Sequence, residues 1–192
     1  MRIAARGRAL VAVALGLSAA RTVQAQAGQL APAQILSLVA AAPSVLGVTV
    51  LSGAAQTIPS LTDNAVNNFP SPVVVRTNWN LQPGQSSSVE LVAYFAVPAQ
   101  ALTGGSTQIA SSRVLGRMTT GLPAAYTAMT AGPVAGAGTA GGSLHLFSQS
   151  ISGSNKVGNR TDNLDLALDL VGFPSLPAGA YSGTLTIQAV TQ

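Results

Sequence analysis

The middle of this chain alternates apolar and polar side chains with a period of two. Over residues 73–81, valines and a tryptophan fall on one face, and an arginine and asparagines fall on the other. Residues 89–97 repeat the alternation, and residues 82–85 between them read Gln-Pro-Gly-Gln, a turn sequence. The pattern predicts two strands that pair as a β-hairpin.

The second half of the chain continues this pattern between loops. Four leucines alternate with Asp165 and Asp169 over residues 164–170, which predicts a strand with buried leucines and exposed aspartates. Further strands are expected over residues 108–119, 143–151 and 181–190, with a Gly/Ala loop over residues 131–142 and a long polar loop over residues 152–163. Short strands between Gly- and Pro-rich turns predict an all-β fold, an antiparallel β-sandwich.

The chain opens with the pattern of a secretory signal peptide, residues 1–27. Three arginines precede a short apolar run, residues 9–20, and small-x-small cleavage sequences close the segment. At about 1.5 Å per residue this run is too short to cross a hydrocarbon layer of about 30 Å. We therefore expect a mature N-terminus between Gln26 and Gly28, and a protein exported to the periplasm, the cell surface or the medium.

Residues 28–72 form an apolar extension that carries no charge as far as Leu61, and residues 73–192 form the predicted sandwich domain. Within the extension we expect a short helix over residues 32–42, a buried strand over residues 45–51 and then a loop rich in Pro and Asn. A membrane-spanning segment over residues 35–51 is the alternative. Pro43 and the absence of flanking charged or aromatic anchors weigh against that alternative.

Loss of the signal peptide removes the net charge of the chain. The precursor carries +4, from nine Lys and Arg against five Asp and Glu. Four of the arginines precede Gln26, so the mature chain is neutral and offers no basic stripe for nucleic acid. The chain has no cysteine, so packing and strand pairing have to supply its stability.

The titratable side chains give no catalytic or metal-binding set. His145 is the single histidine, and with no cysteine it cannot form a typical zinc site; no G-x-S-x-G sequence accompanies it either. Asp165 and Asp169 are about 13 Å apart on a strand, beyond the roughly 5–9.5 Å of glycosidase carboxylates. We therefore predict no catalytic, cofactor-binding or metal-binding residues, no cofactor and no enzymatic activity.

Other polar and aromatic residues have a binding interpretation and a structural one. Oxygen ligands of the loop, Asn155, Asn159, Asp162 and Asn163, lack the spacing of a calcium loop and suit turns instead. Arg76, Arg113 and Arg117 could bind a ligand, although a solvated face with weak ion pairs is the simpler interpretation. Trp79 and Tyr94 could stack on carbohydrate, but Trp79 falls on the apolar face of its strand and suits the core.

The C-terminal residues 176–189, Leu-Pro-Ala-Gly-Ala-Tyr-Ser-Gly-Thr-Leu-Thr-Ile-Gln-Ala, resemble the closing hairpin of bacterial secreted immunoglobulin-like proteins. The resemblance is to spore coat protein U and pilin-type domains, or to WxL-type cell-wall domains. The chain departs from the first group in lacking cysteine, and from the second in matching Trp-x-Leu only once, at Trp79. Tyr181 is expected to act as a tyrosine corner, its hydroxyl bonding main chain just upstream.

These observations predict an exported, non-enzymatic structural or adhesive protein of the bacterial surface or periplasm, which could be a subunit of a surface assembly. A secreted hydrolase and a membrane-anchored accessory protein remain as alternatives. The expected partners are other copies or other surface proteins, bound by strand pairing, with no nucleic acid and with membrane association as the weaker option. Residues 45–51 could pair within their own chain or enter a neighbour's sheet, and the first is favoured.

Overall fold

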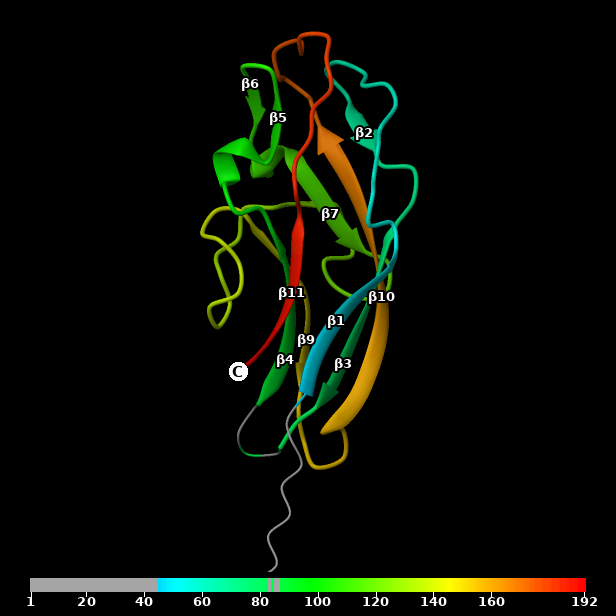
Figure 1. The fold of residues 1–192 in the computed structure, drawn as a ribbon, viewed down its shortest axis with the longest axis vertical. Coiled ribbons are helices and arrows are strands. Elements are labelled where there is room, and N and C mark those ends of the chain that lie inside the picture. Colours follow the sequence, from blue (N-terminus) through cyan, green and yellow to red (C-terminus); the bar gives the residue numbers. More distant parts are fainter. Residues whose placement is uncertain (1–44, 83, 85–86) are drawn as a thin grey trace, which may run out of the picture. The chain divides into compact units, whose positions relative to one another are not determined.

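A computed structural model describes residues 45–82, 84 and 87–192. The signal peptide and the helix expected over residues 32–42 lie outside these residues. The described chain is an all-β fold of two antiparallel sheets packed face to face (Figure 1). The predicted fold class, an antiparallel β-sandwich, is therefore confirmed.

The larger sheet has the strand order β1-β3-β10-β7-β8, with β2 also paired to β10. Its strands are β1 (Val45–Ser52), β2 (Val66–Asn68), β3 (Val73–Asn80), β7 (Val114–Met118), β8 (Thr127–Ala128) and β10 (Val157–Asp169). The smaller sheet has the order β11-β4-β9, and a two-stranded ribbon pairs β5 with β6. These strands are β4 (Ser88–Tyr94), β5 (Leu102–Gly104), β6 (Thr107–Ile109), β9 (Ser143–Ser150) and β11 (Thr186–Thr191). Two single-turn 3₁₀ helices, Pro98–Gln100 and Ser111–Arg113, flank the ribbon.

Alternation along the strands builds the core between the two sheets. The inward residues of β3 and β10 pack against those of β4 and β9, as the period of two requires. All four leucines of the 164–170 stretch are buried, as predicted. Asp165 and Asp169 are half-buried rather than exposed, because each accepts a hydrogen bond from a neighbour.

The predicted hairpin of residues 73–81 with residues 89–97 does not form. β3 lies in the larger sheet, between β1 and β10, whereas β4 lies in the smaller sheet, between β11 and β9. The connection between them therefore crosses from one sheet to the other. Alternation predicts which face of a strand is buried, and that prediction is correct for both strands. It does not predict which strands pair with each other.

The sandwich begins earlier in the chain than the boundary predicted at residue 73. β1 pairs with β3 of the same chain, with an irregularity at Leu51, and β2 pairs with β10. The expectation that residues 45–51 pair within their own chain is confirmed, but they form an edge strand rather than a buried one. Val45 and Leu51 are each about half exposed, while Leu46 and Val48 pack against the core. No described helix is long and apolar enough to cross a membrane.

Three other predicted boundaries differ from the structure. β10 begins at Val157, so the polar loop expected over residues 152–163 is much shorter. The strand expected over residues 108–119 is split into β6, a 3₁₀ turn and β7. The last strand begins at Thr186 rather than at residue 181, because residues before it make only an isolated bridge to Thr103. The strand expected over residues 143–151 is present as β9.

Candidate functional site

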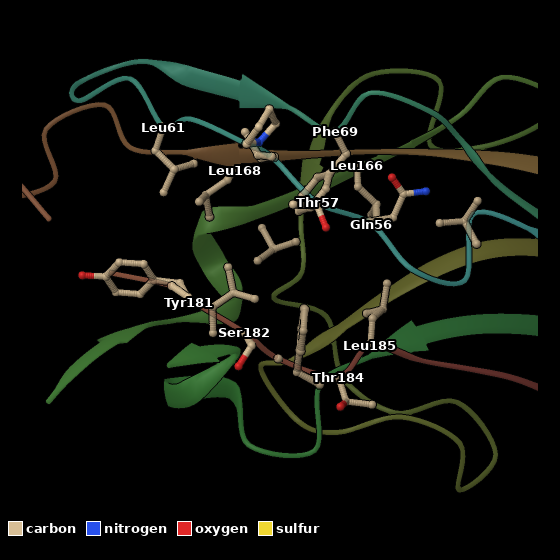
Figure 2. A pocket seen from close by; sticks show the side chains of 18 of the residues that line it. Gln56, Thr57, Leu61, Phe69, Leu166, Leu168, Tyr181, Ser182, Thr184 and Leu185 are labelled. Carbon is tan, nitrogen blue, oxygen red and sulfur yellow. The ribbon is translucent and has the colours of Figure 1, made fainter. Parts of the chain in front are cut away.

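A cleft of about 990 Å³ lies between the two sheets of the described chain. Its base is formed by core residues of the larger sheet and by Phe95, all nearly buried. One wall consists of residues 53–63, which follow β1, together with Phe69. The other wall consists of residues 176–185, which precede β11 (Figure 2). The cleft therefore opens where the two sheets separate. At this place β1 has already ended and β11 has not yet begun.

The lining of this cleft is mainly apolar. Leucines and isoleucines come from both walls and from the base, and they are joined by Phe69 and by Tyr181, whose ring is directed away from the centre of the group in Figure 2. These side chains are Ile58, Leu61, Phe69, Leu166, Leu168, Leu176, Tyr181, Leu185 and Ile187. Within the core cluster several of them are only partly buried. When an apolar group fills a cleft of this kind, water leaves the apolar surface and the free energy falls.

Both walls carry main-chain groups without strand partners. In the described part of the chain, residues 54–61 make no hydrogen bond from main chain to main chain, and residues 174–185 make such bonds only at Ser182. There, Thr103 N donates to Ser182 O at 2.9 Å, and Ser182 N donates to Thr103 O at 3.0 Å. Because successive residues of an extended chain direct their N–H and C=O groups to opposite sides, the neighbours of Ser182 direct theirs away from Thr103.

One contact within the wall at residues 176–185 and one close approach to residue 101 fix its position. The hydroxyl of Tyr181 donates to Pro177 O at 2.9 Å, which is the tyrosine-corner bond that the sequence predicts. Gly183 lies so close to the main chain that an added Cβ would be 1.8 Å from Ala101 O. The wall therefore has a fixed position while its cleft side stays without main-chain partners.

One polar atom in the opposite wall is also unpartnered. Gln56 donates from Nε2 to Gly53 O at 3.1 Å, which anchors the start of that wall. Its other amide atom, Oε1, is buried and has no hydrogen-bond partner among the described residues. A buried acceptor of this kind costs free energy until a donor reaches it. The cleft thus combines apolar surface with unused hydrogen-bonding groups.

The candidate catalytic residues lie apart from one another in the structure. His145 is exposed on β9, with its Nε2 3.1 Å from Gly132 O. Asp165 pairs with Arg117 at 3.0 Å, and Asp169 Oδ1 accepts from Val171 N at 2.9 Å. Within the described residues, no group of three or more His, Cys, Asp or Glu could hold a metal ion.

Among the residues considered as calcium ligands, Asn155 serves local structure. Asn155 closes its turn by donating from Nδ2 to Ser150 O at 2.7 Å and accepting from Ser152 N at 2.6 Å. Its main-chain oxygen accepts from Trp79 Nε1 at 2.9 Å. Trp79 is 7% exposed and lies in the core, in a different sheet from Tyr94, so the two rings do not share a platform.

Sequence reasoning missed a buried ion pair at the inner face of β10. Asp162 is 1% exposed and accepts from Arg160 Nε at 2.6 Å and from Thr120 Oγ1 at 2.7 Å. The guanidinium of Arg160 also lies 4.3 Å from the ring centroid of Phe147. The signal was present in the sequence, because the alternation of the four leucines, extended backwards from residue 164, places both charged residues on the inner face.

Comparisons of the chain with family models, with curated proteins and with solved structures found no match.

Proposed function

We propose that this chain is an exported, non-enzymatic structural or adhesive protein of the bacterial surface or periplasm, which joins an assembly by strand pairing. The observation that carries the proposal is the cleft between residues 53–63 and residues 176–185. An extended chain segment placed there would cover apolar side chains and use main-chain groups that have no partners in the described chain. Addition of a strand is an established mode of peptide recognition.

The ligand that suits such a cleft is an extended polypeptide segment with apolar side chains at alternate positions. Its main-chain groups would pair with the two walls, and every second side chain would enter the cleft. Residues 45–51 do not serve as this segment within their own fold, since β1 is already paired with β3. The partner strand therefore comes from another part of the chain, from another copy or from another surface protein.

The cleft can be tested with one substitution at its wall and one elsewhere. Leu61→Arg places a charge among the apolar side chains of the cleft, whereas Leu122→Arg places the same charge on a leucine that is 73% exposed and outside the lining. We expect the mature protein to form oligomers by native mass spectrometry and size-exclusion chromatography. Leu61→Arg should reduce these oligomers at least about tenfold, because a charge in an apolar contact costs several times RT. Leu122→Arg should leave them unchanged.

Two results would contradict the proposal. One is a strictly monomeric mature protein at all concentrations, with no gain of stability when apolar strand-forming peptides are added. The other is equal assembly by both variants while both remain folded by circular dichroism.

A further inference from the structure

Over β1, β3 and residues 157–163 of β10, the outer face of the larger sheet carries one charged side chain, that of Arg76. Directly opposed residues form rows across β1, β3 and β10, and the central row consists of Thr49, Arg76 and Thr161. The adjacent row consists of Gly47, Asn78 and Asn159. We call the residues of these two rows, together with Asn80 and Asn163, the outer polar face. Asn80 lies between two exposed valines, Val45 and Val157, and Asn163 lies opposite Val74. The side chains of this face are exposed or half-buried, and they point away from the core because their neighbours Val75 and Thr77 are buried.

The charges of β10 nearest to this face are directed to the inner side or neutralised, and Asp169, at the far end of the strand, accepts a hydrogen bond from Val171 N. Arg160 and Asp162 alternate with Asn159, Thr161 and Asn163, and they pair with each other on the inner side of the sheet. Asp165, farther along the same outer side, is paired with Arg117. No unpaired carboxylate therefore competes for a cation on the outer polar face.

Arg76 differs from every other arginine that the structure describes. Arg113, Arg117 and Arg160 each lie over an aromatic ring, at 5.4, 4.7 and 4.3 Å from the centroid. Each of them also donates a hydrogen bond to an oxygen of the protein. Arg76 is exposed and has no ion pair, hydrogen bond or ring contact from its side chain within the described residues. It presents a free guanidinium in the middle of amide and hydroxyl groups.

We infer that the outer polar face binds an acidic polysaccharide, with Arg76 holding the carboxylate of a uronic acid unit. A guanidinium matches a carboxylate with two parallel hydrogen bonds, so one arginine suffices for one such group. The amides and hydroxyls around it can donate to and accept from sugar hydroxyls. Neighbouring side chains of the outer polar face are about 4.8 Å apart across the strands and about 6.8 Å apart along them. They are spread over a sheet face and not gathered in a pocket. That arrangement suits an extended, hydroxyl-rich polymer.

The single positive charge of the outer polar face favours an acidic polysaccharide over other anionic polymers. Nucleic acids and anionic membranes are bound through several cations at once, and this face offers one. The face also lacks the buried aromatic anchors that dominate the binding energy of protein interfaces. The inference rests on the proposed surface location, whereas its test uses purified protein and does not depend on the cleft.

The experiment measures binding of the mature protein to polygalacturonate, to its carboxyl-reduced form and to dextran, by affinity electrophoresis and calorimetry. We expect binding to polygalacturonate and at least about tenfold weaker binding to the two neutral polymers, as expected for loss of a charge-assisted contact. Arg76→Ala should weaken binding to polygalacturonate about tenfold or more, and Arg76→Lys should recover part of it. Asn159→Thr, which leaves the net charge unchanged, should weaken binding by a smaller factor.

Lys156→Ala is the matched control, because Lys156 is an exposed cation that lies outside the outer polar face. It should bind polygalacturonate as the unmodified protein does. Equal losses in Lys156→Ala and Arg76→Ala would mean non-specific ion attraction and would overturn the inference. Equal binding to the carboxyl-reduced polymer, or no binding to polygalacturonate, would overturn it as well. Neither result would bear on assembly through the cleft, which the Leu61→Arg variant tests separately.

Discussion

Removal of Arg160 should destabilise the sandwich more than removal of both charges of its ion pair. In Arg160→Met the carboxylate of Asp162, 1% exposed, would keep only the hydrogen bond from Thr120. It would lose the bonds from Nε, 2.6 Å from Oδ2, and from Nη2 to Oδ1. A buried charge left without its partner typically costs about 3–5 kcal/mol of unfolding free energy. Loss of the contact between Arg160 and the ring of Phe147 adds to that cost.

The double variant Arg160→Met/Asp162→Leu removes both charges and should be within about 1–2 kcal/mol of the unmodified protein. The two substitutions are therefore expected to be strongly non-additive, with a coupling energy of about 2 kcal/mol or more. Urea unfolding followed by the fluorescence of Trp79 measures all four proteins of this cycle, because Trp79 is the single tryptophan and lies in the core.

The reasoning is refuted if Arg160→Met costs less than about 1 kcal/mol, since a solvated carboxylate would then be indicated. It is also refuted if the double variant is destabilised by the sum of the two single variants. Thr120→Val supplies an internal reference. It removes one hydrogen bond to the carboxylate and should cost about 1.5–3 kcal/mol, less than Arg160→Met.

Three further predictions follow from other parts of the chain. Leu166→Ala should lower the unfolding free energy measured in urea by about 2–5 kcal/mol, because Leu166 is 7% exposed; a cost below about 1 kcal/mol would contradict its place in the core. Gly158→Ala should destabilise the fold and shift the emission of Trp79, since an added Cβ would be 2.6 Å from the indole ring; an unchanged spectrum and melting temperature would contradict that contact. Intact-mass measurement of exported protein should give an N-terminus between Gln26 and Gly28, and retention of the first methionine would disprove the signal peptide.

Side-chain alternation was enough to predict the fold class and most of the buried residues. The leucines of residues 164–170, the inward face of residues 73–81 and the strand at residues 143–150 all follow from a period of two. The partners of the strands do not follow from it. The turn at residues 82–85 suits a hairpin, yet the packing of two sheets separates β3 from β4. Local pattern cannot encode a choice that depends on strands far away in the sequence.

The start of β10 and the cleft show two other reasons for missed predictions. Residues 157–163 look like a polar loop because Gly158, Arg160 and Asp162 occupy the inner positions that leucines occupy farther along the strand. Pairing with Arg160 and a hydrogen bond from Thr120 make the burial of Asp162 possible. The cleft walls look like ordinary loops in the sequence. Their significance comes from their position on either side of apolar side chains, which is set by the separation of the two sheets.

The position of β10 in the chain affects when folding can begin. This strand joins β3, β2 and β7 into one sheet, yet it comes near the end of the chain, and β11 follows it to complete the other sheet. Neither sheet can be completed while the C-terminal quarter of the polypeptide is still missing, and sheets built from such distant segments form slowly. For a protein exported as we propose, this strand order keeps the polypeptide in a threadable state during passage through the membrane and postpones closure of the sandwich until it has emerged.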